Sequence, residues 1–76
     1  FCGNNLEKIL IPESVNLLEG HAFDNNPLNR IVIPSKVVIE RYALPEGFVN
    51  LYENNSLESG EYELINYNWV RSAEYP

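Results

Sequence analysis

The feature of this sequence that most constrains its fold is an internal repeat. Residues 6–15 return as residues 28–37, at an offset of 22 positions. When 1–15 is aligned with 23–37, seven of fifteen positions are identical, and both copies space their apolar residues as Leu-x-x-Ile-x-Ile. Equivalent sequences favour equivalent conformations that stack on one another. The repeat therefore predicts two similar units packed side by side.

A period of 21–22 residues with this spacing predicts a leucine-rich repeat solenoid, mainly β, with short helical or 3-10 turns on its convex side. Each unit contributes one short strand, near 8–11 and 30–33, and units stacked in register require these strands to be parallel. We expect a third strand near 48–52 and an antiparallel β-hairpin cap at 61–71. Asn4 and Asn26 recur before the strands, where their side chains are expected to bond backbone groups.

The chain divides into two segments of different composition. Residues 1–44 hold two leucine-rich repeats, the first truncated at its N-terminus, so we expect the natural protein to continue upstream. Residues 45–76 form a C-terminal capping segment that holds six of the nine aromatic residues. A terminal unit must cover the apolar stack of its neighbour, so Phe48 and Trp69 are expected to be mostly buried. A sugar- or protein-binding platform is the alternative role for these rings.

The charge distribution excludes some classes of partner. The formal net charge is −6, and residues 45–76 carry six acids against Arg71 alone. Because neither segment offers a basic patch, nucleic acid and anionic membrane surfaces are not expected as partners. No apolar run approaches the roughly 18 residues of a membrane span, so membrane insertion is not expected either.

The sequence offers little for catalysis, and we expect no enzyme. Cys2 and His21 are the only thiol and imidazole, and no orienting Asp or Asn lies at a recognisable spacing from them. Four acids of the tail match no EF-hand loop and are expected to be solvated. These acids are Glu53, Glu58, Glu61 and Glu63. We therefore expect no catalytic residue, no metal and no cofactor.

Side chains that point away from the core of the stacked strands give a candidate binding face. Side chains alternate along a strand, so residues 8 and 10 point outward when 9 and 11 point inward. Exposed apolar side chains gain nothing in a monomer, which favours a contact surface, although such residues also simply suit strands. The candidate ligand-binding residues are the stacked pairs Lys8–Arg30 and Leu10–Val32, flanked by Glu7 and Asn29.

The repeat motif resembles a known family. Phe-x-x-Asn-x-Leu-x-x-Ile-x-Ile-Pro-x-x-Val followed by Ala-Phe is similar to the BspA-type leucine-rich repeat of surface and secreted proteins from host-associated bacteria and some protists. Residues 1–44 match the repeat, and 45–76 resembles the segment that often closes such arrays. The sequence departs from the pattern at Leu44, where the motif has Phe, and by a one-residue deletion after Val37.

The resemblance implies a non-enzymatic protein-binding or adhesion module, extracellular or at the cell surface, with a host surface or matrix protein as partner. The alternative is a purely structural C-terminal cap or spacer of a longer solenoid, with no ligand of its own. Because the expected upstream repeat is missing from this truncated piece, the strand edge at 8–11 is expected to be uncovered. We therefore expect self-association through the N-terminal edge.

Overall fold

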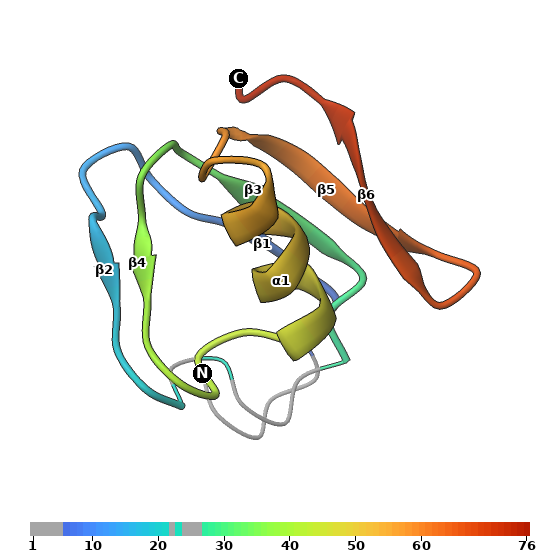
Figure 1. Ribbon diagram of the computed structural model, residues 1–76, viewed down its shortest axis with the longest axis horizontal. Helices are drawn as coiled ribbons and strands as arrows, with labels where there is room; N and C mark the ends of the chain where they lie inside the picture. Colours follow the sequence, from blue (N-terminus) through green and yellow to red (C-terminus); the bar gives the residue numbers. More distant parts are fainter. Residues whose placement is uncertain (1–5, 22, 24–26) are drawn as a thin grey trace.

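The computed structural model describes residues 6–21, 23 and 27–76 of the 76-residue chain. A four-stranded sheet has the strand order β1-β3-β5-β6, and a two-stranded sheet joins β2 to β4 (Figure 1). The elements in chain order are β1 (Lys8–Leu10), β2 (Leu17–Leu18), β3 (Arg30–Ile33), β4 (Val38–Ile39), α1 (Glu46–Asn54), β5 (Gly60–Ile65) and β6 (Asn68–Ala73).

The two repeat units lie side by side, and their strands pair in parallel. β1 pairs with β3 so that Ile9 lies beside Ile31, which is the 22-residue offset of the alignment. β2 pairs with β4 so that Leu18 lies beside Ile39, an offset of 21. The one-residue deletion therefore falls in the turn between the two strands of the second unit. The parallel pairing predicted for 8–11 with 30–33 is present.

The remaining strands are antiparallel, and the predicted solenoid of parallel strands is wrong. β5 pairs antiparallel with β3, with Gly60 opposite Ile33, and β6 pairs antiparallel with β5. The molecule is instead a mixed four-stranded sheet with a second, two-stranded sheet and one helix. Its β5–β6 hairpin is an integral half of the main sheet.

The segment predicted as a third strand, 48–52, lies in α1. Phe48 and Tyr52 are buried and stand four residues apart, which is the spacing of one helical face. A strand that turned both rings inward would also turn Asn50 inward, at the cost of burying an amide. Pro45 directly precedes the helix, where its missing N–H costs no helical hydrogen bond.

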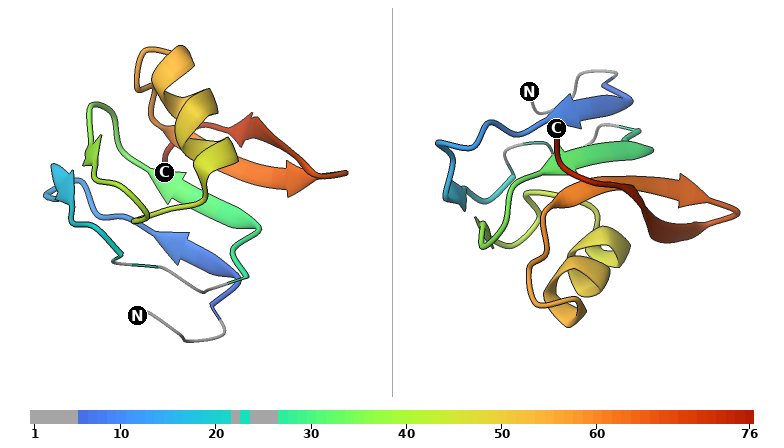
Figure 2. Two further views of the ribbon diagram at one scale, coloured as in Figure 1. Left: turned by 60° about the horizontal axis from the view of Figure 1, so that its bottom comes forward. Right: turned by 90° about the horizontal axis from the view of Figure 1, so that it is seen from above.

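The path of α1 explains why β5 runs opposite to β3. The helix follows β4 and runs back along the sheet, so that the chain reaches the carboxyl end of β3 again (Figures 1 and 2). There the Lys36 N–H donates to the Leu57 carbonyl oxygen at 3.1 Å. A strand that begins beside the end of β3 must run back along it, so β5 pairs antiparallel.

The core lies between one face of the four-stranded sheet and a layer formed by α1 and the β2–β4 sheet (Figure 2). Phe48, Tyr52 and Tyr62 are each 0% exposed, and Phe48 packs edge-on against Tyr62 at 5.1 Å between ring centroids. Trp69 contacts Phe48 at 5.6 Å but is only partly buried. The expected burial is thus confirmed for Phe48 and only partial for Trp69.

The hydroxyl of Tyr52 ties α1 to the turn after β3. It donates to the Pro34 carbonyl oxygen at 2.7 Å and accepts from the Val37 N–H at 3.0 Å. Burial raises the pKa of Tyr52 above its ordinary value of 10.0, and the hydrogen bond from Val37 offsets part of that rise. The buried hydroxyl therefore uses both its donor and its acceptor capacity.

We predict that Tyr52→Phe destabilises the protein by about 1–3 kcal/mol, because it leaves the Pro34 carbonyl and the Val37 N–H without their shared partner. Urea denaturation followed by circular dichroism measures the change. Tyr67→Phe is the matched control, since that ring is 98% exposed and its loss of a hydroxyl should change nothing. Equal stability of Tyr52→Phe and the wild type would contradict the role given to the hydroxyl.

Candidate functional site

The strand register continues each of the two predicted pairs, Lys8–Arg30 and Leu10–Val32, into a row that ends at an acid of β5. Lys8 of β1 lies beside Arg30 of β3, and Arg30 lies opposite Glu63 of β5. The second row is made of Leu10, Val32 and Glu61. The structure therefore brings the four paired candidates to one face, and it adds two acids that the sequence had assigned to solvated surface. Two acids at alternate positions of β5, Glu61 and Glu63, were the signal in the sequence.

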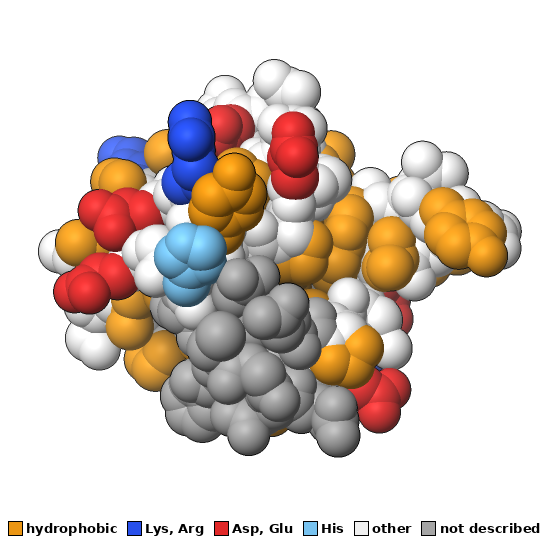
Figure 3. All heavy atoms as spheres, turned by 90° about the horizontal axis from the view of Figure 1, so that it is seen from below, with side chains coloured by type: hydrophobic (Ala, Val, Ile, Leu, Met, Phe, Trp, Pro, Cys, Tyr) orange, Lys and Arg blue, Asp and Glu red, His pale blue; other side chains and the backbone are white. Residues whose placement is uncertain are grey.

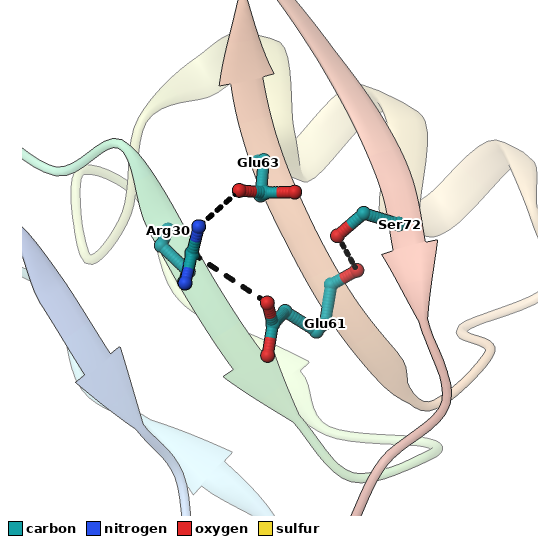
Figure 4. A network of polar contacts seen from close by, with 4 residues as sticks. All are labelled: Arg30, Glu61, Glu63 and Ser72. Atoms are coloured by element: carbon teal, nitrogen blue, oxygen red, sulfur yellow. Dashed lines mark hydrogen bonds and ion pairs between the residues drawn. The ribbon is translucent and has the colours of Figure 1, made fainter.

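Arg30 is bound by both of these acids. Its guanidinium donates a hydrogen bond to the Glu63 carboxylate, and its Nε lies 3.5 Å from Glu61 Oε2 (Figure 4). The Ser72 hydroxyl of β6 donates to the Glu61 carbonyl oxygen at 3.2 Å. The two acids neutralise the cation that the repeat stacks beside Lys8, which removes the repulsion between like charges. The charge of Arg30 is therefore neutralised within the chain by Glu61 and Glu63.

The electrostatic setting of Glu63 follows from these contacts. Hydrogen bonding from Ser72 and from Arg30 lowers the pKa of the Glu63 carboxyl below its ordinary value of 4.5, and the positive charge of Arg30 adds to the effect. All of these interactions favour the ionised carboxylate. The Ser72 hydroxyl has one hydrogen, so at any moment it serves either Glu63 or the Glu61 carbonyl.

Val32, the other candidate of β3, is also inaccessible, because it is buried. Alternation along β3 places its side chain on the outer face with Leu10, yet Val32 is 2% exposed whereas Leu10 is 58% exposed. After β6 the chain runs back across β3 toward β1, and the Tyr75 hydroxyl donates to the Ile11 carbonyl oxygen at 2.6 Å (Figure 2). The last residues therefore shield this part of β3.

The four other candidates remain exposed and gather at the β1 side of the sheet. They are Glu7, Lys8, Leu10 and Asn29. Asn29 is held there by its N–H, which donates to the Glu7 carbonyl oxygen at 2.8 Å. Of the six candidate residues, these four therefore remain accessible, beside the first strand.

An apolar groove of about 330 Å³ opens beside this strand. Its lining is Leu6, Ile9, Leu10, Ile11, Pro12, Val15, Leu18 and Phe23. Ile9 and Ile11 are 7% and 3% exposed, and their equivalents in the second repeat unit, Ile31 and Ile33, are 0% exposed between β1 and β5. Within the described residues no third unit covers the first one. Of these lining residues, only Leu10 was expected from the sequence to bind a ligand.

β1 is an edge strand of the sheet. The Ile11 N–H donates to the Val32 carbonyl oxygen at 2.8 Å, and the Glu7 carbonyl accepts from the Arg30 N–H at 3.2 Å, so the odd-numbered residues turn their backbone groups toward β3. Alternation along a parallel strand turns the N–H and C=O groups of Lys8 and Leu10 the other way. No strand of the described part of the chain pairs with that side.

The single imidazole lies on another part of the surface. His21 packs against Tyr42 with ring centroids 5.2 Å apart, and both residues have φ of 64° at equivalent turns of the two units (Figure 3, histidine in pale blue). Cys2, weighed as a catalytic partner of His21, lies outside the described residues. Asn4 and Asn26, expected to bond backbone groups, lie outside them as well.

No family model, curated protein or solved structure matches this chain. The resemblance to the BspA-type repeat therefore stays a prediction. Across 6–21, 23 and 27–76, no three His, Cys, Asp or Glu side chains gather as a metal-binding group. The same residues include no helix with the length and apolar character needed to span a membrane.

We predict that Glu63→Gln lowers the melting temperature at neutral pH and flattens its dependence on pH in acid. Because the folded state lowers the pKa of Glu63, its contribution is present above about pH 4.5 and is lost as the pH falls through the lower pKa of the folded state. Thermal unfolding between about pH 3 and 7 measures this. Glu53→Gln, at an exposed position of α1, is the control and should keep the wild-type slope. An unchanged slope in Glu63→Gln would contradict the assignment.

Proposed function

We propose that this chain is a non-enzymatic protein-binding or adhesion module of a secreted or cell-surface protein, and that it binds through the β1 end. The observation that supports this most is the apolar groove that opens beside the edge of β1 with which no described strand pairs. An apolar groove supplies affinity by removing surface from water, and a strand edge supplies directed hydrogen bonds. The partner is a protein segment, because a protein carries both apolar side chains for the groove and backbone groups that can hydrogen-bond to the strand edge.

Strand addition is the mode of binding that fits these two features. An extended segment laid along β1 pairs with the backbone groups of Lys8 and Leu10 that face away from β3. Its alternate side chains then enter the groove, where Val15 and Phe23 are only partly buried. The backbone groups give affinity for any extended chain, and the apolar wall selects aliphatic or aromatic side chains.

The rim of the groove suits a protein interface. Glu7 and Lys8 are exposed charges of opposite sign beside an apolar centre, and polar rims around apolar centres are typical of protein interfaces. Arg30 does not contribute a free charge, since Glu61 and Glu63 neutralise it. The choice of a host surface or matrix protein as the partner, and a location outside the cell, rest on the resemblance of the repeat alone.

A purely structural cap or spacer without a ligand is the second candidate. It is favoured by the way α1 and β5 close the far side of the second repeat unit, where Phe48 and Tyr62 pack against the core with 0% exposure. In this role the closed side ends a stack of units, and the groove has no ligand of its own.

Purified matrix proteins passed over the immobilised chain test the binding function, with affinity measured by surface plasmon resonance. We predict that Leu10→Asp weakens the binding of a matrix protein by at least about tenfold, because it places a charge at the groove and the strand edge. Val38→Asp is the matched control, since Leu10 and Val38 are 58% and 59% exposed strand residues and Val38 lies in the other sheet.

Two outcomes would contradict the binding function in different ways. If the wild-type chain bound no matrix protein, the structural cap would be the better account. If Leu10→Asp bound as tightly as the wild type, the binding site would lie away from β1. Circular dichroism of both variants shows whether each one is folded.

A further inference from the structure

We infer that a groove between β4 and α1 is a second binding surface, and that it takes an extended protein segment in which lysine alternates with an aliphatic residue. The groove has a volume of about 710 Å³ and lies between the end of β4, the turn that follows it and one side of α1. It shares no lining residue with the groove beside β1. The inference therefore goes beyond the proposed function and does not depend on it.

The lining of this groove combines an apolar floor with an acidic rim. Ile39 and Val49 are partly buried against the core, and Leu44 is 6% exposed. Glu46 and Glu53 are exposed and stand seven residues apart on α1, which is about two helical turns, so both lie on the side of the helix that lines the groove. Aliphatic side chains of a partner suit the floor, and cations suit the rim.

The charge of the groove is negative. Its charged side chains are three acids against one base, which gives a formal charge of −2. The base, Arg41, lies over the ring of Tyr42 at 5.8 Å from its centroid, and Glu40 accepts a hydrogen bond from a backbone N–H at 2.9 Å. Neither Glu46 nor Glu53 forms an ion pair with a described residue. Both carboxylates are therefore available to the cations of a partner.

Glu53 is unfavourably placed for the stability of α1. It lies in the last turn of this nine-residue helix, where the helix end carries partial negative charge and no base is present. A residue that violates a local rule without a compensating contact is expected at a functional site. A bound lysine would supply the positive charge that this end of the helix lacks.

The backbone of β4 favours an extended segment over a free amine. The N–H groups of Val38 and Glu40 donate to carbonyl oxygens on the β2 side at 3.0 and 2.9 Å. Alternation turns the backbone groups of Ile39 the other way, to the side on which the Val37 N–H meets the Tyr52 hydroxyl of α1. No strand of the described residues pairs with this side of β4. Ile39 therefore offers one N–H and one C=O to an extended partner.

An alternating segment matches the floor and the rim at the same time. Successive side chains of an extended chain point to opposite faces, and those on one face are about 6.7 Å apart. The aliphatic residues then face the floor. The lysines lie on the other face, and their long flexible stems let the ammonium groups reach the acids of the rim.

Calorimetric titration of the 76-residue chain with the blocked hexapeptide Lys-Val-Lys-Val-Lys-Val tests the groove. We expect binding that weakens at least about fivefold when salt is raised from about 20 to about 200 mM, because salt screens exposed charges. The same peptide with Glu in place of Lys should not bind, since its charge then has the sign of the groove. No binding of the lysine peptide up to about 1 mM would overturn the inference.

Glu53→Lys separates the binding role of this acid from its effect on stability. The variant should raise the melting temperature by a few degrees and weaken binding of the lysine peptide at least about tenfold. Glu74→Lys is the matched control, because it makes the same change in net charge at an exposed position after β6, and it should bind nearly as tightly as the wild type. Equal weakening by both variants would overturn the groove as the site. A lower melting temperature of Glu53→Lys would overturn the argument from the helix end.

N-methylation of the peptide tests its pairing with Ile39. The N–H groups of the lysines point to one edge of the extended peptide and those of the valines to the other edge. Methylation of one set should therefore abolish binding, whereas methylation of the other set should leave it. An equal effect of the two methylations would overturn the pairing with β4.

Discussion

The rest of this structure depends on where α1 sits, and a buried hydroxyl fixes that position. Tyr52 reaches from the helix to the turn after β3 and bonds both the Pro34 carbonyl and the Val37 N–H. A buried polar group that lost these partners would carry a desolvation cost, so the helix has one favourable depth over the sheet. At that depth Phe48 meets Tyr62, and the chain leaves the helix beside the end of β3. The antiparallel half of the sheet follows from this exit point.

The functional surface is therefore determined by what the second half of the chain covers. β5 lays Glu61 and Glu63 against Arg30, and the residues after β6 shield Val32. Both are outward-facing strand residues that an isolated pair of repeats would expose. The first strand receives neither kind of cover among the described residues. Accessible apolar surface and backbone groups that no described strand pairs with consequently coincide at β1, although Lys8, Ile9 and Leu10 are of the same kind as their counterparts in β3.

The sequence predicted well where it repeats and poorly where it does not. Two segments of similar sequence favour the same conformation and stack in register. The 22-residue offset alone therefore predicted that Ile9 lies beside Ile31. Beyond residue 44 no repeat restricts the chain, and the run 48–52 fits a strand by its alternation as well as a helix by its spacing of four. The sequence did not reveal the ion pairs of Arg30 for a related reason. The partners of Arg30 stand more than thirty residues further along, at Glu61 and Glu63, and strand pairing over that distance leaves no local signal.

The hydrogen bond from the Tyr75 hydroxyl to the Ile11 carbonyl joins residues 64 positions apart in a chain of 76. Closing so long a loop costs chain entropy, so we expect this contact to form late in folding, after both repeat units and the hairpin. Interactions absent from the transition state act on the unfolding rate and leave the folding rate unchanged. We therefore expect that trimming the C-terminal residues with a carboxypeptidase shortens the lifetime of the folded chain without slowing its formation.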